Sequence, residues 1–405
     1  YQLKNNQYWD LKQNKLNIIK QLADIHDSGN PYIIYKSNRG FDLYTNFSKK
    51  IILNNKNIYN FLNTKYKKKK SKNTDLFIGF FGYELLNNLI GVKIPKQKDN
   101  NFPKGIFYKP EKKISFTKNL VYKNNNSIKL KKKFKININR KLYTKIFNKF
   151  KKNIKSGETY QIKICTKYKT RAKINPLDFF CRLSKANLAP EAFMIRDKNY
   201  SIISCSPENL ITKRGSLISS KPIAGTVKKN KNMNKIKALN YFKKNLKENK
   251  EHNMIVDMER NDLSRICKVN TVKLSKTKIV EEYKDLFHFV SLIEGKLKKN
   301  IKNIDIIKAM MPGGSVIGCP KISTLNLLNR QEKESRNIYT GSFGYIKFNG
   351  DMRFGIIIRS ILNFQNISEI AVASGVVVDS SANNEFNENY IKAKALIDLF
   401  KWFIY

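Results

Sequence analysis

The fold is decided by one stretch, MMPGGSVIGCPK at Met310–Lys321. It holds two prolines, three glycines and a serine between two segments with helical apolar spacing, Ile304–Met310 and Ile322–Arg330. Glycines let the backbone approach a ligand closely, and the N–H groups at the start of a helix attract anions. The stretch therefore predicts a loop that builds a binding site. A tight structural connection is the simpler interpretation of one such loop taken alone.

The composition predicts a globular enzyme-sized protein. The chain has 405 residues, 41% of them hydrophobic, and no uncharged apolar run approaches the ~18 residues of a membrane helix. Five cysteines without CxxC spacing argue against a zinc site or a disulfide framework. We therefore expect a soluble, cytoplasmic protein without a membrane partner. The chain starts at Tyr1 rather than Met, which leaves a preceding targeting segment open.

The net charge of +48 raises nucleic-acid binding as a hypothesis from a different class. The excess is mostly lysine, spread along the chain together with many Asn, Ile, Tyr and Phe residues, which is typical of A/T-rich codons. A nucleic-acid-binding protein concentrates its cations on one face with aromatic side chains for stacking. We therefore expect no nucleic-acid partner, and one continuous positive groove would mark the alternative.

Apolar patterns predict strands interleaved with helices, which indicates an α+β or mixed α/β fold. We expect strands at Tyr32–Tyr35, Phe41–Tyr44, Tyr160–Tyr168, Ala192–Ile195, Tyr200–Cys205, Glu208–Arg214, Ser216–Ser219, Asn337–Phe348, Phe354–Asn363 and Ile370–Val378. We expect helices at Gln13–Asp27, Tyr143–Ser156, Asn232–Asn261 with a break near Glu248, Phe287–Glu294, Ile304–Met310 and Glu385–Trp402. We expect Phe77–Leu89 to form a buried strand followed by a helix, and Lys93–Lys113 to be a polar segment. A soft boundary separates residues 1–140 from residues 141–405.

Two pairs of carboxylates have the spacing that places both side chains on one helix face: Glu248 with Glu251, and Glu385 with Glu388. Ligands that are all oxygen suit Mg²⁺, which takes a few carboxylates and keeps several waters. Each pair alone is more typical of a solvated helix face in a lysine-rich chain.

The order of five motifs resembles the chorismate-binding family, which includes anthranilate synthase component I, aminodeoxychorismate synthase component I and the isochorismate synthases. The motifs are KPIAGT at Lys221–Thr226, ENKEHNMIVDMERNDLSR at Glu248–Arg265, the loop at Met310–Lys321, GSFGYIKFNGDMRFGIIIR at Gly341–Arg359 and SGVVVDSSANNEFNENYIK at Ser374–Lys392. The resemblance is dense from about Ser156 onward and thin before it. It implies two packed, antiparallel-rich sheets flanked by helices, with an N-terminal part intertwined with the catalytic part.

The resemblance also implies roles for individual residues. One Mg²⁺ would be held by the two carboxylate pairs and would grip the ring carboxylate of chorismate. Substrate binding would fall to Gly314, Tyr345, Arg359, Ser374, Gly375 and Lys392, and catalysis to Gln161, Ala224, Thr226, His288 and Ser315. His288 and Ser315 would lie at the C4 hydroxyl, where an imidazole that titrates near neutral pH supplies general-acid help. The chain departs from the family at Ala373, where glycine is frequent, so a methyl group is expected to tighten that loop.

Two positions bear on the reaction. Members that add water carry a lysine base where this chain has Gln161, and glutamine cannot deprotonate water. The resemblance therefore implies an enzyme that adds ammonia, which a separate glutamine amidotransferase subunit would supply. Aminodeoxychorismate synthases often carry a nucleophilic lysine at the position of Ala224, where anthranilate synthases have alanine. Lys163 shares a strand face with Gln161, and whether it replaces that nucleophile is open.

The remaining motifs favour the aminodeoxychorismate branch, which makes a folate precursor by a transaminase-type reaction. They are PGGSVIGCPK with Ser315, NLAPEAF at Asn187–Phe193, RNDLSRIC at Arg260–Cys267 and YTGSFGY at Tyr339–Tyr345. The start of the chain has Ile34-Tyr35-Lys36-Ser37 where anthranilate synthases have a Leu-Leu-Glu-Ser feedback element, which argues against classical tryptophan feedback. The anthranilate branch, a lyase of tryptophan synthesis, is the alternative because of Ala224. The patterns leave the product and the oligomeric state open.

Overall fold

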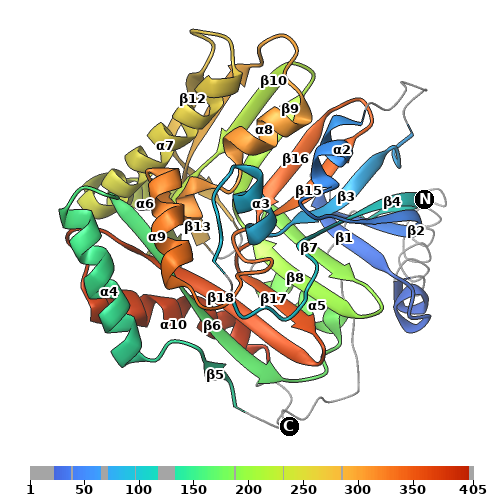
Figure 1. The fold of residues 1–405 in the computed structure, drawn as a ribbon, viewed down its shortest axis with the longest axis horizontal. Helices are drawn as coiled ribbons and strands as arrows, with labels where there is room; N and C mark the ends of the chain where they lie inside the picture. Colours follow the sequence, from blue (N-terminus) through green and yellow to red (C-terminus); the bar gives the residue numbers. More distant parts are fainter. Residues whose placement is uncertain are drawn as a thin grey trace, which may run out of the picture.

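Hydrogen bonds link the strands of the computed structural model into one long antiparallel sheet (Figure 1). The structure describes residues 22–37, 40–64, 72–95, 97–116, 133–186, 188–230, 232–283 and 286–400. The strands are β1 Tyr32–Ser37, β2 Gly40–Ile52, β3 Leu76–Phe81, β4 Gly105–Phe116, β5 Lys135–Ile136, β6 Gln161–Arg171, β7 Glu191–Arg196, β8 Tyr200–Ser206, β9 Asn209–Arg214, β10 Leu217–Lys221, β11 Ile223–Lys228, β12 Lys273–Glu282, β13 Leu286–Lys296, β14 Gly318–Cys319, β15 Ser342–Lys347, β16 Met352–Ile356, β17 Ser360–Phe364 and β18 Ile367–Val376.

The strand pairing follows one path through the sheet. From one edge it runs β5, β6, β18, β17, β8, β7, β1, β2, β4, β3, β15, β16, β9, β10 and β13. β13 also pairs with β11 and β12, and β14 pairs with the start of β6. The sheet curls until β7 packs against β15, where the rings of Phe193 and Phe343 stack at 3.7 Å between centroids. The mixed α/β class is confirmed, and hydrogen bonds join the two expected sheets into one.

Helices flank this sheet (Figure 1). They are α2 Ile58–Asn63, α3 Tyr83–Leu89, α4 Arg140–Lys155, α5 Pro176–Ala186, α6 Lys235–Lys244, α7 Leu246–Ile266, α8 Asn303–Met310, α9 Lys321–Gln331 and α10 Ala382–Asp398, with a 3-10 turn η1 at Gly314–Val316. α4 and α10 pack on β18, α5 covers β7 and β8, and α7 lies against β11, β13 and α8. Within the described ranges, no helix combines the length and the apolar character needed to cross a membrane.

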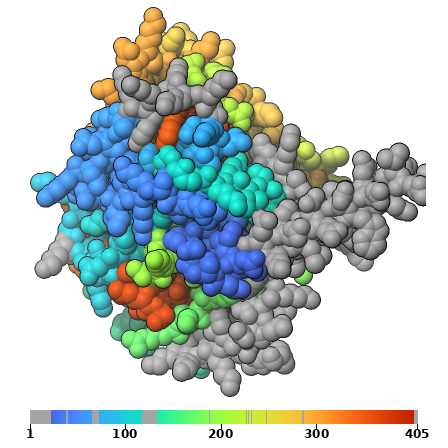
Figure 2. All heavy atoms as spheres, turned by 90° about the vertical axis from the view of Figure 1, so that its right-hand side faces the viewer, coloured from blue at the N-terminus to red at the C-terminus, as the bar shows by residue number. Residues whose placement is uncertain are grey.

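The N-terminal strands are woven into the later part of the chain. β1 lies between its neighbour β2 and the distant β7, and β3 lies between its neighbour β4 and the distant β15. Figure 2 shows the blue and cyan N-terminal residues on one face of the molecule beside green and red residues from later in the chain. The boundary at residue 140 stays a prediction.

The most regular segments follow their sequence patterns. The stripe Tyr143, Ile146, Phe147 and Phe150 is buried on α4, as its helical spacing predicts. The helix begins at Arg140, earlier than expected, because the side chain of Asn139 accepts a hydrogen bond from the N–H of Leu142 at 2.9 Å. The strand and helix expected in Phe77–Leu89 are β3 and α3.

Phe287–Glu294 is not a helix, so that prediction is wrong. It forms β13, which pairs with β10, β11 and β12. The residues FHFVSLI are continuously apolar and rich in aromatic and branched side chains, and periodicity alone does not separate a buried strand from a buried helix in so short a run. His288 consequently projects from a strand.

Two further predictions fail for local reasons. The single strand expected at Phe354–Asn363 is divided into β16 and β17, because Arg359 adopts a left-handed φ of 50°. The polar segment Lys93–Lys113 contains most of β4, which pairs with β2 and β3; its first half, Gly105–Tyr108, is buried, and its lysines lie in the more exposed second half. The strand expected at Asn337–Phe348 is confined to β15.

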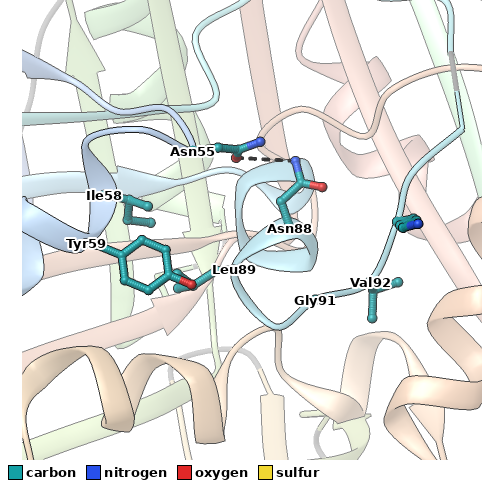
Figure 3. A pocket seen from close by; sticks show the side chains of 8 residues that line it. Asn55, Ile58, Tyr59, Asn88, Leu89, Gly91 and Val92 are labelled. Carbon is teal, nitrogen blue, oxygen red and sulfur yellow. Dashed lines mark hydrogen bonds between the residues drawn. The ribbon is translucent and has the colours of Figure 1, made fainter.

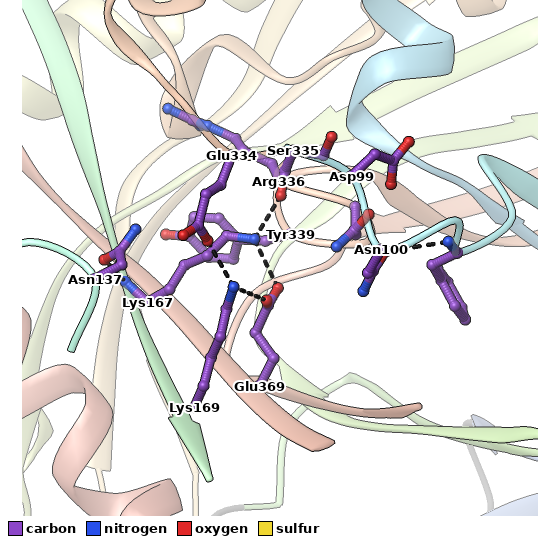
Figure 4. A network of polar contacts seen from close by, with 12 residues as sticks. Asp99, Asn100, Asn137, Lys167, Lys169, Glu334, Ser335, Arg336, Tyr339 and Glu369 are labelled. Carbon is purple, nitrogen blue, oxygen red and sulfur yellow. Dashed lines mark hydrogen bonds and ion pairs between the residues drawn. The ribbon is translucent and has the colours of Figure 1, made fainter. Parts of the chain in front are cut away.

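A buried polar network holds the C-terminal half of β6 in place (Figure 4). Lys167, with only 2% of its surface exposed, donates to Glu369 at 2.8 Å and to the backbone carbonyl of Ser335 at 2.5 Å. Lys169 is more exposed and bridges Glu334 at 2.6 Å and Glu369 at 3.3 Å. The network ties β6 and β18 to the segment that precedes β15.

We expect Lys167→Met to lower the free energy of unfolding by about 3 kcal/mol, because it leaves a buried carboxylate and a buried carbonyl without their main donor. Lys169→Met on the same strand is the matched control and should cost less than about 1 kcal/mol, since its ion pairs are partly solvated. Urea unfolding of both variants measures the difference. Equal losses in the two variants would show that the buried network does not stabilise β6.

Candidate active site

The start of β6 presents two side chains to α7. Lys163 donates to Oε1 of Glu251 at 2.8 Å, and Gln161 donates to the same oxygen at 3.1 Å. Both project from one face of the strand, as the alternation of strand side chains predicts. Attraction to Lys163 lowers the pKa of the Glu251 carboxyl to about 2. Burial lowers the pKa of Lys163, but the attraction of Glu251 outweighs it, so the pKa lies above its ordinary value. Lys163 is therefore an ammonium ion, which is not a nucleophile.

β18 brings Gly375 directly opposite Lys163. A Cβ on Gly375 would lie 2.7 Å from Nε2 of Gln161 and 2.8 Å from Nζ of Lys163, so a side chain there would displace the ends of these two side chains. The preceding Ser374 is buried, and its hydroxyl is hydrogen-bonded to the hydroxyl of Tyr143 at 2.8 Å. Ala373 lies within β18 rather than in a loop, so the expected tightening of a loop by its methyl group does not occur.

α10 supplies the second carboxylate pair. Ser380 donates to Oε1 of the buried Glu385 at 2.9 Å, and Lys392 pairs with Glu388 at 2.7 Å. Lys392 also donates to the carbonyl of Ala373 at 3.0 Å, and its charge contributes to the low pKa of Glu251. The tertiary structure therefore gathers Lys392, Ser374, Gly375, Glu251 and Glu388 around the start of β6.

His288 and position 224 lie on the paired strands β13 and β11, against which α7 packs. His288 has 1% of its surface exposed and lies opposite Thr226 in the pairing of β13 with β11. Burial and the positive charge of Arg359 lower the pKa of His288 to about 4. The expected titration near neutral pH is therefore wrong, and the ring is neutral there. The buried Ala224 precedes Gly225, whose would-be Cβ lies 2.9 Å from Oε2 of Glu248. The side chain of Thr226 lies outside the described part of the structure.

The loop at Met310–Lys321 brings Ser315 to the same region. Gly314 admits no side chain, because a Cβ there would lie 2.0 Å from the sulfur of Met258 on α7. Ser315 is buried on η1 beside the carboxylate of Glu208. Lys321 turns inward and donates to Asp262 at 2.5 Å, which fixes the start of α9 to α7. The loop is therefore held rigidly against the inner face of α7.

Glu208 is a site residue that the sequence patterns did not indicate. Burial raises the pKa of its carboxyl to about 7, although Ser315 and the charge of Lys163 lower it. Arg359, whose own pKa is lowered by burial, is near both Glu208 and His288. A carboxyl that titrates near neutral pH can both donate and accept a proton. The one sequence signal was an acidic residue at the start of the apolar strand β9.

Tyr345 does not join this group. Its ring lies 6.2 Å from the ring of Tyr35, and its charged neighbours include Arg353 and Glu191. Tyr339 is the tyrosine that contacts β18. It is buried with Ala373, and its hydroxyl meets the backbone of that residue. The structure thus places Tyr339 against β18 and Tyr345 beside Arg353 and Glu191.

The four glutamates match Mg²⁺ in the chemistry of their donor atoms but are not arranged as a closed cage. Within the described residues, no group of three His, Cys, Asp or Glu side chains is close enough to hold a metal ion. Glu251 is occupied by Lys163 and Gln161, and Glu388 by Lys392. Lysine ammonium groups therefore neutralise the carboxylates that the ion would need.

A separate hollow of about 330 Å³ lies between α2 and α3 (Figure 3). It is lined by Asn55, Ile58, Tyr59, Asn88, Leu89, Gly91, Val92 and Lys93. Asn88 donates to Asn55 across it at 3.4 Å. None of the expected site residues lines it, so it is not part of the candidate active site.

Comparison with known proteins decides the family. The family profile described as chorismate binding enzyme matches residues 29–398. The chain belongs to the chorismate-binding enzymes. This chorismate-binding enzyme is 33% identical to aminodeoxychorismate synthase component 1 of Bacillus subtilis over 255 residues, 63% of this chain and 54% of the relative. It is 30% identical to an anthranilate synthase component I-like protein of Synechocystis over 347 residues, 79% of this chain and 72% of the relative.

The match to the Bacillus protein thus spans about half of that relative's length. Solved structures share the fold of this chorismate-binding enzyme. Anthranilate synthase component I of Streptococcus pneumoniae superposes with a TM-score of 0.72 at 24% identity, covering 90% of each chain. The menaquinone-specific isochorismate synthase of Escherichia coli gives a TM-score of 0.72 at 16% identity, covering 91% of this chain and 88% of the other. At these identities the likeness concerns the fold alone.

The raised pKa of Glu208 predicts a specific dependence of stability on pH. The folded protein holds this proton up to about pH 7, whereas the unfolded chain releases it near 4.5. The folded state therefore binds more protons in this window, and its stability falls as the pH rises. We expect Glu208→Gln to remove a decline of about 3 kcal/mol between these pH values.

Urea unfolding of the wild type and of Glu208→Gln from pH 4.5 to pH 8 measures this difference. Glu158→Gln, at an exposed position, is the matched control and should follow the wild type. Parallel stability profiles for Glu208→Gln and the wild type would contradict the assignment of a neutral buried carboxyl.

Proposed function

We propose that the protein is aminodeoxychorismate synthase component I, which replaces the C4 hydroxyl of chorismate by an amino group. Ammonia would come from a separate glutamine amidotransferase subunit. The observation that carries the proposal is the amide of Gln161, which donates a hydrogen bond to Glu251. An amide does not accept a proton from water, so a nucleophile that needs no deprotonation is favoured. The similarity to the Bacillus aminodeoxychorismate synthase supports the branch.

The site residues have distinct tasks in this proposal. Arg359 and Lys392, together with the backbone at Ser374 and Gly375, would bind the substrate carboxylates, since cations and N–H groups are what carboxylates require. The neutral ring of His288 would donate an N–H hydrogen bond to the departing hydroxyl. Glu208 is the group whose pKa allows it to give that hydroxyl a proton near neutral pH.

Magnesium belongs to the proposal through the two carboxylate pairs. Glu251 and Glu388 would hold the ion, with Glu248 and Glu385 behind them, and the ion would neutralise the ring carboxylate of chorismate when bound. The oxygen-only donor set supports this assignment. The ion pairs of Glu251 and Glu388 with lysines have to open before either carboxylate binds a metal.

Anthranilate synthase component I is the second candidate, and Ala224 is the observation that favours it. The buried methyl group at this position offers no nucleophile, and Lys163 is held as an ammonium ion by Glu251. Several relatives are anthranilate synthases, including that of Aquifex aeolicus, which is 32% identical over 267 residues. The two candidates differ in the ring position that receives the amino group and in whether the same enzyme also eliminates the enolpyruvyl side chain.

The product formed from chorismate distinguishes the two. We expect the protein, incubated with chorismate, Mg²⁺ and ammonium, to form a 4-amino product that aminodeoxychorismate lyase converts to para-aminobenzoate. Anthranilate is fluorescent and needs no lyase, so chromatography before and after the lyase separates the outcomes. Anthranilate as the main product would refute the aminodeoxychorismate assignment and establish the alternative.

Glu251→Gln and Glu388→Gln test the carboxylate pairs. We expect each to reduce turnover of chorismate by at least about a hundredfold, because loss of a metal ligand removes several kcal/mol of transition-state stabilisation. Glu158→Gln, outside the site, should retain wild-type activity. Circular dichroism checks that the variants are folded, and near-normal activity in both would rule out the metal assignment.

A further inference from the structure

The ammonium group of Lys163 lies among the carboxyl groups of Glu251, Glu388 and Glu208. It donates to Glu251 at 2.8 Å, and the charges of Glu388 and Glu208 also act on it. Only 11% of its side chain is exposed. Of the carboxylates around this point, Glu251 lies on α7, Glu388 on α10 and Glu208 just before β9. Lys163 thus stands where carboxyl groups from three separate elements converge, with Lys392 and Arg359 as neighbouring cations.

The position of Lys163 is imposed by its surroundings. Its backbone carbonyl accepts a hydrogen bond from the buried Arg336 at 3.1 Å, and its N–H donates to the carbonyl of Ile317 in the loop at 3.0 Å. The ammonium group packs directly over Gly375, where a Cβ would lie 2.8 Å from it. The strand is held on both sides, so the side chain has a short range of motion around Glu251.

We propose that Lys163 is a built-in cation that competes with a divalent metal ion for Glu251. This competition rests on the Mg²⁺ site of the proposed function, and Lys163 is the residue that opposes metal binding there. The ammonium group neutralises the charge of Glu251 and repels a second cation, and together with the amide of Gln161 it occupies lone pairs of Oε1 that a metal ion would use. Metal binding therefore requires Lys163 to leave Glu251, and this lowers the affinity of the site for metal.

Direct measurement of metal binding tests the proposal without any turnover. Mn²⁺ is the probe, because the electron paramagnetic resonance signal of the free ion reports its concentration. We expect Lys163→Gln and Lys163→Met to lower the Kd for Mn²⁺ by about tenfold or more, the ratio that corresponds to about 1.4 kcal/mol. Glutamine keeps a hydrogen bond to Glu251 without the charge, so this variant also guards against misfolding of the methionine variant.

Three matched variants locate the effect. Lys163→Arg retains the positive charge and should bind Mn²⁺ as weakly as the wild type. Lys169→Met removes a lysine from the same strand but outside the site and should leave the Kd unchanged. Adding Glu251→Gln to Lys163→Gln should abolish the gain, because the released carboxylate is then absent.

The outcomes separate the inference from the function on which it rests. Equal Kd values for the wild type and Lys163→Gln overturn the competition but leave a metal site in place. Absence of Mn²⁺ binding in both overturns the competition and the metal assignment together. Neither result changes the identity of the product formed from chorismate, which is measured separately. Thermal unfolding of each variant confirms that the compared proteins are folded.

Discussion

The antiparallel pairing of β6 with β18 is the constraint on which the rest of the site depends. Its register, from Arg171 opposite Ile367 to Ile162 opposite Val376, sets Gly375 against Lys163. A slip by one residue would turn Gln161 and Lys163 to the opposite face of the sheet. β14 pairs with the start of β6 on its other side, so the glycine-rich loop is brought to the same place. α10 follows directly from β18, and its carboxylates are positioned by the same register.

Ion pairs with lysines of other elements hold α7 in place. Two of its acidic residues are each paired with a lysine from another element: Glu251 with Lys163 of β6, and Asp262 with Lys321 of α9. Buried charges are costly unless paired, so these contacts restrict where the helix can lie. Glu259 is fully buried with the hydroxyl of Ser220, and burial raises its pKa well above the ordinary value. The same low-dielectric interior keeps Glu208 protonated up to neutral pH and His288 neutral, so the packing of the core also determines the protonation of the site.

Local patterns predicted those elements in which one face is buried and one is solvated. The stripe on α4 is an example, because its periodicity is specific to one type of structure. Prediction failed in one short segment that is buried on both faces and where the chain bends sharply. β13 is apolar on both faces, and its aromatic and branched residues fit a helix or a strand. Arg359 adopts a left-handed conformation that no local pattern marks, since a non-glycine residue accepts it only when tertiary contacts compensate.

The sequence by itself determined the residue types of the site, the order of the motifs and, through them, membership in the chorismate-binding enzymes. It also determined that Gln161 and Lys163 share a face. Only the tertiary structure decided that Lys163 pairs with Glu251, 88 residues away, that Glu208 lies beside Ser315, and that Tyr345 lies near Glu191. The physical reason is that ion pairing and pKa depend on distances and burial between segments remote in the chain, whereas a sequence pattern reports only the neighbours along one strand or helix.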